Sequence, residues 1–288
     1  MENTSITAMI ERVHAINKDM LKEFDRLCKS HDAVYFLAFG GLLGAVRHQD
    51  FIPWDNDVDV LMTYAEYEKI RPFLKTDIDQ TKYEGVYPED FGKKYMDIVP
   101  RLFYRHATIR MDGSYVAYYD GIPNRIGLDI FLMDRFPSGF LGKVFFFRIA
   151  LRYALLNGKR DRISIEHYPA VMKPIGWLLG HIGRCFNTEK LRKKTEKITR
   201  KYENRTDIHT YRVINDNMTN LAREIPESYI ASTVEVPLGE DHFPAPVEKE
   251  KLLTLWFNDY MTLPPENERI FYMGNVPAKP EDYVFTED

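Results

Sequence analysis

The sequence predicts an α/β (α+β) protein in which a mixed sheet with flanking helices precedes a basic helical segment. Apolar residues recur every three or four positions over 6–28, which indicates an amphipathic helix. Short apolar runs at 33–39, 57–62 and 127–133 have the length of buried strands. From 138 to 201 the pattern changes to longer helical runs rich in Lys and Arg. Elements of both kinds favour packed layers around one core.

Composition excludes several other classes of protein. With 288 residues, of which 44% are hydrophobic and 28% charged, the chain is neither collagen-like, nor a coiled coil, nor largely disordered. Its two cysteines, Cys28 and Cys185, are too few for a disulfide framework or a four-ligand zinc site, which favours a reducing compartment. Residues 1–20 carry scattered charges and no apolar stretch, so we expect no signal peptide and a cytoplasmic location.

The formal net charge of −4 conceals a strong asymmetry. Residues 135–205 contain 17 Lys and Arg against 5 Asp and Glu, a formal charge of +12, which leaves −16 for the rest of the chain. A basic segment within an acidic chain indicates a surface that meets an anionic partner, such as a phospholipid face, a phosphorylated glycan or a nucleic acid. The alternative is a set of solvated helix faces.

The first elements should form one packed unit. The helix over 6–28 is expected to pack on the strand and helix that come after it in the chain. The run AVYFLAF, residues 33–39, predicts a buried strand that stops at a tight turn formed by Gly40 and Gly41. A short helix, LLGAVRH, is expected to begin after the two glycines, at residues 42–48.

The next elements complete the predicted sheet. Residues 57–62, DVDVLM, alternate acidic and apolar side chains, as a strand with two different faces does. A helix is expected over 63–74, and strands at 97–104, 114–119 and 127–133.

Three helices are predicted in the middle of the chain, at 139–156, 169–186 and 188–202. The first two are interrupted by basic residues and are too short and too charged to span a bilayer, although they could lie on one. The Pro-rich last third is expected to be loop-rich around one apolar helix at 247–260.

The strongest functional pattern lies within residues 39–62. Backbone amides at Gly40 and Gly41, near the start of a helix, favour phosphate. Asp57 and Asp59 are two positions apart, so a strand places both carboxylates on one face while the intervening valines enter the core. Two adjacent carboxylates repel each other, and a divalent cation such as Mg²⁺ removes that cost.

Two further acids are candidates for the same site. Asp129 is a single charge within an apolar strand and would complete a three-carboxylate metal site; the alternative is a position at a strand edge or cap. Asp55 either forms the turn after Pro53 and Trp54 or orients a metal-bound water or an acceptor.

Positive side chains should face the phosphates. Arg47 lies in the predicted turn-helix and its planar guanidinium suits phosphate oxygens; the alternative is a structural ion pair. Arg101 is predicted in a strand, where an inward-pointing side chain needs an anion. His48 and His106 have no partner at metal-ligand spacing, so we expect ordinary surface or core histidines.

The run GGLLGAVRH followed by FIPWDNDVDV resembles the signature of the LicD family, which includes fukutin-like proteins and belongs to the nucleotidyltransferase superfamily. The run GLDIFLMD around Asp129 and residues 243–269 extend the resemblance, which is not visible in the basic middle of the chain. The family often has three consecutive acids where Asn56 interrupts them here. That departure leaves Asp57 and Asp59 in place.

The resemblance implies a nucleotidyltransferase-like fold and transfer of phosphocholine, or a related phospho-alcohol, from CDP-choline or another CDP-alcohol. The acceptor would be a hydroxyl of a cell-surface glycan such as a teichoic acid or lipopolysaccharide precursor. Asp57, Asp59 and Asp129 would hold one or two Mg²⁺ ions, for which Mn²⁺ could substitute. Asp129 or Asp55 would take the acceptor proton.

The change in composition along the chain, together with the resemblance, divides it into three expected regions. Residues 1–135 would be the catalytic core, residues 136–205 a basic helical subdomain facing a membrane or the acceptor, and residues 206–288 a C-terminal segment that packs back on the core.

A choline headgroup would require aromatic rings, because a quaternary ammonium cannot donate a hydrogen bond. Tyr115, Tyr118 and Tyr119 precede Asp129, and Trp54 precedes the acidic pair, so these four residues are candidates for a choline cage. With 18 Tyr and 18 Phe in the chain, the alternative is ordinary core packing.

The middle helices combine bulky apolar and basic residues, as interfacial helices that bind anionic lipid do. We therefore expect peripheral contact with the inner face of the cell membrane through residues 139–187, where a lipid-linked glycan would be presented. The alternative is a helical subdomain that only covers the sheet.

Three other functions compete with phosphocholine transfer. The first is nucleotidyl transfer from a nucleoside triphosphate to a sugar, alcohol or protein. The second is noncatalytic binding of a nucleotide or glycan. The third is modification of nucleic acid, which we do not expect because the basic residues alternate with large apolar ones.

Overall fold

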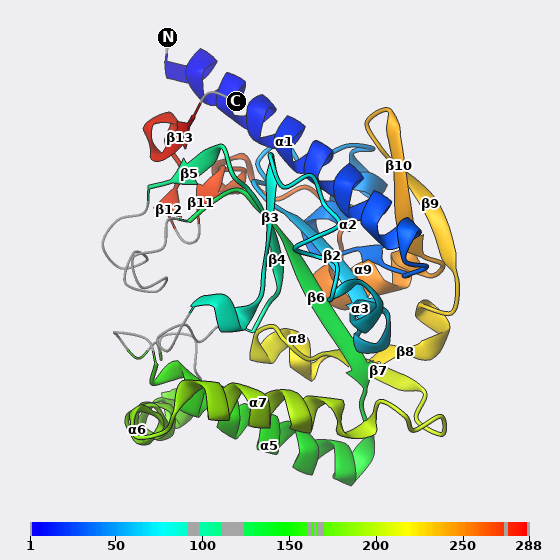
Figure 1. Ribbon diagram of the computed structural model, residues 1–288, viewed down its shortest axis with the longest axis vertical. Helices are drawn as coiled ribbons and strands as arrows, with labels where there is room; N and C mark the ends of the chain where they lie inside the picture. Colours follow the sequence, from blue (N-terminus) through cyan, green and yellow to red (C-terminus); the bar gives the residue numbers. More distant parts are fainter. Residues whose placement is uncertain are drawn as a thin grey trace.

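A mixed sheet forms the centre of the protein (Figure 1). The computed structural model describes residues 2–91, 98–110, 124–159, 163, 165, 170–273 and 276–286. Within that part of the chain the sheet has seven strands, and its main path runs β1-β2-β6-β4-β3, with β7 on β6 and β8 on β7. The strands are β1 (Phe36–Leu37), β2 (Val58–Thr63), β3 (Tyr83–Val86), β4 (Arg101–Tyr104), β6 (Gly127–Arg135), β7 (Thr210–Val213) and β8 (Ile225–Pro226). The predicted mixed fold class is confirmed.

The pair β2 and β6 runs parallel, and the other described pairs of this sheet run antiparallel. Three two-stranded ladders lie outside it. They are formed by β5 (Ala107–Ile109) with β13 (Tyr283–Phe285), β9 (Thr233–Leu238) with β10 (Asp241–Pro246), and β11 (Tyr272–Met273) with β12 (Val276–Pro277).

Helices surround the sheet on several sides. The α-helices are α1 (Glu2–Ser30), α2 (Phe39–Arg47), α3 (Tyr64–Ile70), α5 (Gly139–Asn157), α6 (Lys173–Arg184), α7 (Thr188–Thr199), α8 (Met218–Ala222) and α9 (Lys249–Phe257). The 3₁₀ turns are η1 (Pro88–Phe91), η2 (Ala170–Met172), η3 (Arg200–Tyr202), η4 (Glu227–Tyr229), η5 (Glu266–Glu268) and η6 (Pro280–Asp282). None of the helices in the described ranges is both long and apolar enough to cross a membrane.

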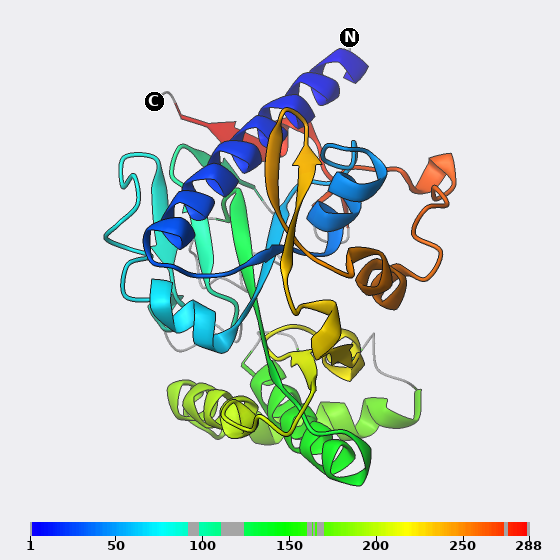
Figure 2. The same cartoon turned by 90° about the vertical axis from the view of Figure 1, so that its right-hand side faces the viewer.

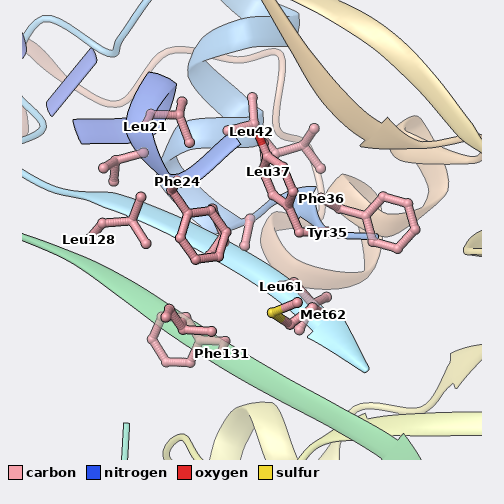
Figure 3. Packing of buried hydrophobic residues seen from close by; sticks show 14 of the residues in the cluster. Leu21, Phe24, Tyr35, Phe36, Leu37, Leu42, Leu61, Met62, Leu128 and Phe131 are labelled. Atoms are coloured by element: carbon pink, nitrogen blue, oxygen red, sulfur yellow. The ribbon is translucent and has the colours of Figure 1, made fainter. Parts of the chain in front are cut away.

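The apolar periodicity of the first helix fixes its position. Leu21 and Phe24 of α1 are fully buried and pack near Leu128 of β6, as Figure 3 shows. The same core includes Leu37 and Leu42, from β1 and α2. Deep burial of such side chains is the main favourable contribution to folding.

The helices α5, α6 and α7 form a separate layer at the bottom of Figures 1 and 2. A second, smaller cluster of buried residues lies there, formed by Phe136, Phe145, Ile149, Tyr202 and Leu221. Leu221 belongs to α8, so the C-terminal part of the chain contributes to this cluster.

Two local expectations differ from the structure. The helix α2 begins at Phe39, so Gly40 and Gly41 lie inside its first turn and not in a turn before it. The strand β1 is limited to two residues because Phe39 takes a positive φ of 40° and the chain turns into the helix at that point. The strand expected at 114–119 lies outside the described residues.

One buried carboxyl group in the sheet should make stability depend on pH. Asp134 of β6 is buried, and desolvation raises its pKa to about 7 from an ordinary value of 3.8. One of its oxygens accepts a hydrogen bond from the Arg135 amide, while Oδ2 has no partner within the described structure. The neutral acid is therefore the favoured form in the folded protein.

Because the folded state binds this proton more tightly than the unfolded chain, the free energy of unfolding should fall as pH rises from about 4 to 7. The Asp134 contribution to this fall is at most about 4 kcal/mol. The variant Asp134→Asn lacks the titrating proton, so urea denaturation should find it more stable than wild type at pH 8, with the difference shrinking toward pH 5. An equal difference at both values would contradict the assignment.

Candidate functional site

The parallel pair β2 and β6 brings two of the predicted acids together. Asp59 and Asp129 are direct register partners in this ladder, where neighbouring strands lie about 4.8 Å apart. Asp57 precedes β2 and is two positions before Asp59, so the strand pattern places it toward the same face. Val58 and Val60, on the other face, are fully buried as predicted.

The first turn of α2 lies on the acidic face of the sheet. Phe131 is two residues after Asp129 on β6, and its ring meets the ring of Phe39 edge to face at 5.0 Å. The Phe39 ring also contacts Trp256 of α9, with the centroids 4.5 Å apart. Phe39 is the first residue of α2, so the glycine amides of that turn are close to the acids.

Arg101 binds Asp129 and fixes its orientation. The two residues are register partners in the ladder of β4 and β6. Nε of Arg101 donates to Oδ1 at 2.6 Å and Nη2 donates to Oδ2 at 3.1 Å, a bidentate ion pair. An inward-pointing Arg101 was expected to need an anion. The Asp129 carboxylate of the protein itself is that anion.

The carboxylate of Asp55 lies over the first turn of α2. A Cβ added to Gly40 would lie 2.0 Å from Oδ2 of Asp55, so any side chain at position 40 would displace that carboxylate. A Cβ added to Gly41 would lie 3.7 Å from its closest neighbour, the Asp59 carbonyl oxygen, which is an ordinary van der Waals distance. Asp55 also forms the expected turn, because its amide donates to the Ile52 carbonyl at 2.9 Å.

The acidic loop is held from outside by α1. Nε2 of His14 is 2.7 Å from the Asp55 carbonyl oxygen, and Nδ2 of Asn17 donates to the Asn56 carbonyl at 3.1 Å. His14 and Asn17 are one helical turn apart, so one side of α1 contacts both peptide units. These positioning residues were not predicted from the sequence, although a polar Asn17 within the apolar stripe of the helix was a signal for one of them.

Desolvation, and for Asp57 and Asp59 also the crowding of negative charge, raises the pKa values of the acids. Asp57 keeps an exposed surface, but it lies among so many protein atoms that desolvation raises its pKa well above the ordinary value; Asp55 and Asp129 raise it further. Desolvation also raises the pKa of Asp59, followed by repulsion from Asp57 and Asp129. A hydrogen bond between the carboxyl groups of Asp55 and Asp57 favours the ionised form of Asp55 and the neutral form of Asp57.

A fifth acid, Asp216, adds to the negative field. Repulsion from Asp216 contributes to the raised pKa of Asp59. The preceding residue, Asn215, ties this loop to β6: its Oδ1 accepts from the Leu132 amide at 2.7 Å and its Nδ2 donates to the Ile130 carbonyl at 3.1 Å. Asp216 was not predicted from the sequence, although the polar run NDN at 215–217, just after β7 and Ile214, was a signal for it.

Arg47 lies at the opposite end of α2 from the glycines. Its Nη1 donates to the Tyr260 carbonyl at 2.8 Å, while burial and then the positive charge of Arg269 lower its pKa.

The Trp54 ring meets the His48 ring edge to face, with the centroids 5.9 Å apart, and the Arg269 guanidinium lies 5.8 Å from the centroid of Trp54. Binding of phosphate by Arg47 stays a prediction, as does binding of choline by Trp54.

The remaining candidates are placed as follows. Nε2 of His106 is 2.8 Å from the Thr81 carbonyl oxygen, in agreement with an ordinary role. Tyr115, Tyr118 and Tyr119 lie outside the described residues.

The carboxylate oxygens on the acidic face are the kind of ligand that a hard divalent cation such as Mg²⁺ prefers. Desolvation, and after it repulsion from neighbouring carboxylates, raises the pKa values of Asp57 and Asp59, and a divalent cation would compensate the negative charge. In the described part of the chain, no three His, Cys, Asp or Glu side chains are arranged closely enough to hold a metal as they stand. The oxygens of Asp129 would therefore have to be shared between Arg101 and an ion.

A cavity of about 300 Å³ lies elsewhere, between α3 and α7. Tyr64, Tyr67, Glu196 and Asn215 are among its lining residues, and none of the predicted site residues that the structure describes lines it. The hydroxyl of Tyr64 donates to Glu196 at 2.5 Å, and the Arg200 guanidinium covers its ring at 3.9 Å. Asn215 connects this cavity with the loop that carries Asp216.

Comparisons with known proteins agree with the signature around Gly40 and Asp59. Residues 32–125 match the family LicD, described as LicD/FKTN/FKRP, nucleotidyltransferase domain. Over 263 residues the chain is 27% identical to the lipopolysaccharide cholinephosphotransferase LicD of Haemophilus influenzae, covering 87% of this chain and 91% of that protein. An uncharacterized protein of Rickettsia typhi is 29% identical over 108 residues, which are 36% of this chain and 33% of the relative. The resemblance to the LicD family is confirmed.

The two glycines of α2 should respond differently to the same substitution. Gly40→Ala would force the Asp55 carboxylate away from the helix, whereas Gly41→Ala meets only an ordinary contact and gains helix propensity. Urea denaturation should therefore find Gly40→Ala about 1–3 kcal/mol less stable than Gly41→Ala. Equal stability of the two variants would show that Asp55 does not occupy this position.

Proposed function

Because residues 32–125 match the LicD family, we propose that the chain transfers phosphocholine or a related phospho-alcohol from a CDP-alcohol such as CDP-choline. The acceptor would be a hydroxyl group of a surface-glycan precursor of the lipopolysaccharide or teichoic acid type. The observation that carries the proposal is the register that places Asp59 beside Asp129, close to the first turn of α2. The similarity of the chain to a lipopolysaccharide cholinephosphotransferase supports it.

The reaction assigns distinct tasks to the protein. The acceptor oxygen forms a bond to the phosphorus that carries choline, the bond from that phosphorus to the CMP oxygen breaks, and CMP leaves. Backbone amides of Gly40 and Gly41 are proposed to bind phosphate oxygens, since amides in the first turn of a helix favour anions. Asp57, Asp59 and Asp129 would hold Mg²⁺, which when bound neutralises the charge of the diphosphate.

The acceptor proton requires a base, and Asp55 suits this task better than Asp129. Both oxygens of Asp129 accept hydrogen bonds from Arg101, which favours its ionised form and weakens it as a base. Burial raises the pKa of Asp55, which strengthens it as a base, and Asp55 is not one of the three carboxylates proposed to hold the cation. Asp55 is thus proposed as the base, and Arg101 as the residue that positions Asp129.

Replacement of one central carboxylate should abolish transfer while leaving the fold intact. With CDP-choline, Mg²⁺ and lipopolysaccharide or teichoic acid that lacks phosphocholine, the wild-type chain should release CMP and label the glycan. Asp59→Asn should lower the rate at least 100-fold, because one ligand of the cation and its charge are lost. The exposed Asp207→Asn is the matched control and should retain full activity.

The same assay decides between the competing functions. Release of pyrophosphate from CTP or ATP, without CMP release from CDP-choline, would favour a nucleotidyltransferase. Unaltered function in both Asp57→Asn and Asp59→Asn would favour a noncatalytic binding protein.

Donor binding can be tested separately from transfer. A ligand that binds only the folded protein raises the melting temperature by mass action. We expect CDP-choline, CDP-ethanolamine or CDP-ribitol to raise it in the presence of Mg²⁺ and to lose most of this effect in Asp59→Asn. The absence of a shift with every cytidine compound would contradict the proposal.

A further inference from the structure

The helices α5 and α6 expose an unusual amount of apolar surface. On α5, Phe140 is 83% exposed and Phe147 is 66% exposed. On α6, Trp177 is 50% exposed and Leu178 is 53% exposed. Other large apolar residues exposed on or beside these two helices are Leu141, Val144, Leu151, Val171, Met172, Ile175, Ile182 and Phe186. So many exposed large apolar side chains on two helices that pack together indicate an interaction site.

The packing of α6 explains why its large side chains point outward. The buried residues of this helix are Gly176, Gly180 and Gly183, which recur every three or four positions and so share one face. A Cβ on Gly183 would lie 1.9 Å from the Leu155 carbonyl oxygen of α5, so the two backbones are in direct contact there. Close contact through glycines leaves no room for larger residues on the inner face. The apolar side chains of α6 are therefore held on the outside.

The exposed stripe of α5 is bordered by cations. Phe140, Val144, Phe147 and Leu151 are spaced by four, three and four residues and form one stripe along the helix. At 100° per residue, Lys143 lies beside one edge of this stripe and Arg148 beside the other. Both basic side chains are exposed.

The full sequence of 139–187 has eight Lys or Arg against two acids, Asp161 and Glu166, and both acids lie outside the described residues. The described residues of 139–187 contain six Lys or Arg and no Asp or Glu. An apolar face bordered by cations and free of acids in the described segment is complementary to a bilayer surface that carries anionic lipid. Trp177 fits the same surface, since indole rings favour the boundary between acyl chains and headgroups.

We propose that the outer face of α5 and α6, which we call the α5–α6 face, binds the surface of an anionic lipid bilayer. Phe147, Trp177 and Leu178 insert between the headgroups, and Lys143 and Arg148 contact lipid phosphates. The binding depends on these two helices and is independent of phosphocholine transfer.

The test is flotation of the full-length chain with vesicles, in the absence of donor and acceptor. Vesicles of phosphatidylcholine containing about one third phosphatidylglycerol should bind the chain, pure phosphatidylcholine should bind it more weakly, and salt should weaken the binding. The double variant Lys143→Gln/Arg148→Gln should lower the partition coefficient about 30-fold at low salt, because each cation near an anionic surface contributes about fivefold. Lys29→Gln/Lys251→Gln removes the same charge elsewhere and should bind as wild type does.

The apolar part of the face is tested with matched serine variants. Phe147→Ser/Leu178→Ser should lower binding at least tenfold, since two exposed apolar side chains no longer enter the lipid. Met261→Ser/Leu263→Ser changes two apolar residues exposed in the C-terminal part and should have no effect. Thermal unfolding of each variant shows whether it folds as wild type does.

Depth of insertion has an independent readout. The chain has three tryptophans, Trp54, Trp177 and Trp256. Brominated lipids should quench the fluorescence of the wild-type chain and quench Trp177→Phe much less.

Three results would overturn the proposal. The first is no flotation with anionic vesicles, and the second is equal loss of binding in the test and control variants. The third is a lipid-free dimer that Phe147→Ser/Leu178→Ser dissociates, because the face would then pair two copies of the chain.

Discussion

The parallel pairing of β2 with β6 is the constraint on which the acidic site depends. Its register sets Asp59 beside Asp129, and a shift by one residue would turn one of the two carboxylates toward the buried face. Neighbouring elements stabilise this arrangement from different directions. Arg101 of β4 binds Asp129, while His14 and Asn17 of α1 hold the loop that leads into β2. The negative charge of the site is thus surrounded by groups from segments far apart in the sequence.

Local pattern was sufficient to predict the elements that carry the site. The alternation of residues 57–62 predicted the strand β2 and the burial of Val58 and Val60, and the apolar run around Asp129 predicted β6. The bidentate pair between Arg101 and Asp129 could not be predicted, because it depends on the register of β4 against β6. The same limit applies to Asp216, which reaches the site through the bonds of Asn215 to β6.

The start of a helix and the direction in which its apolar face points also could not be predicted from local sequence alone. The two glycines predicted a turn before α2, but they lie within its first turn because the change of direction occurs at Phe39. For α6, the sequence left two alternatives, apolar residues that face a membrane or apolar residues that cover the sheet. The structure holds them on the outside, because backbone contact with α5 requires the glycine face to be buried.

The arrangement around Asn215 affects the order in which the site forms during synthesis. Asp59 and Asp129 can meet once β6 has left the ribosome, but Asp216 follows Asp129 by 87 residues. The intervening chain includes all of α5, α6 and α7. A nascent chain therefore has the acidic pair well before the loop of Asn215 closes against β6, and the helical layer can fold in that interval. The last carboxylate joins the site only after Asp216 itself has left the ribosome, with about three quarters of the chain translated before it.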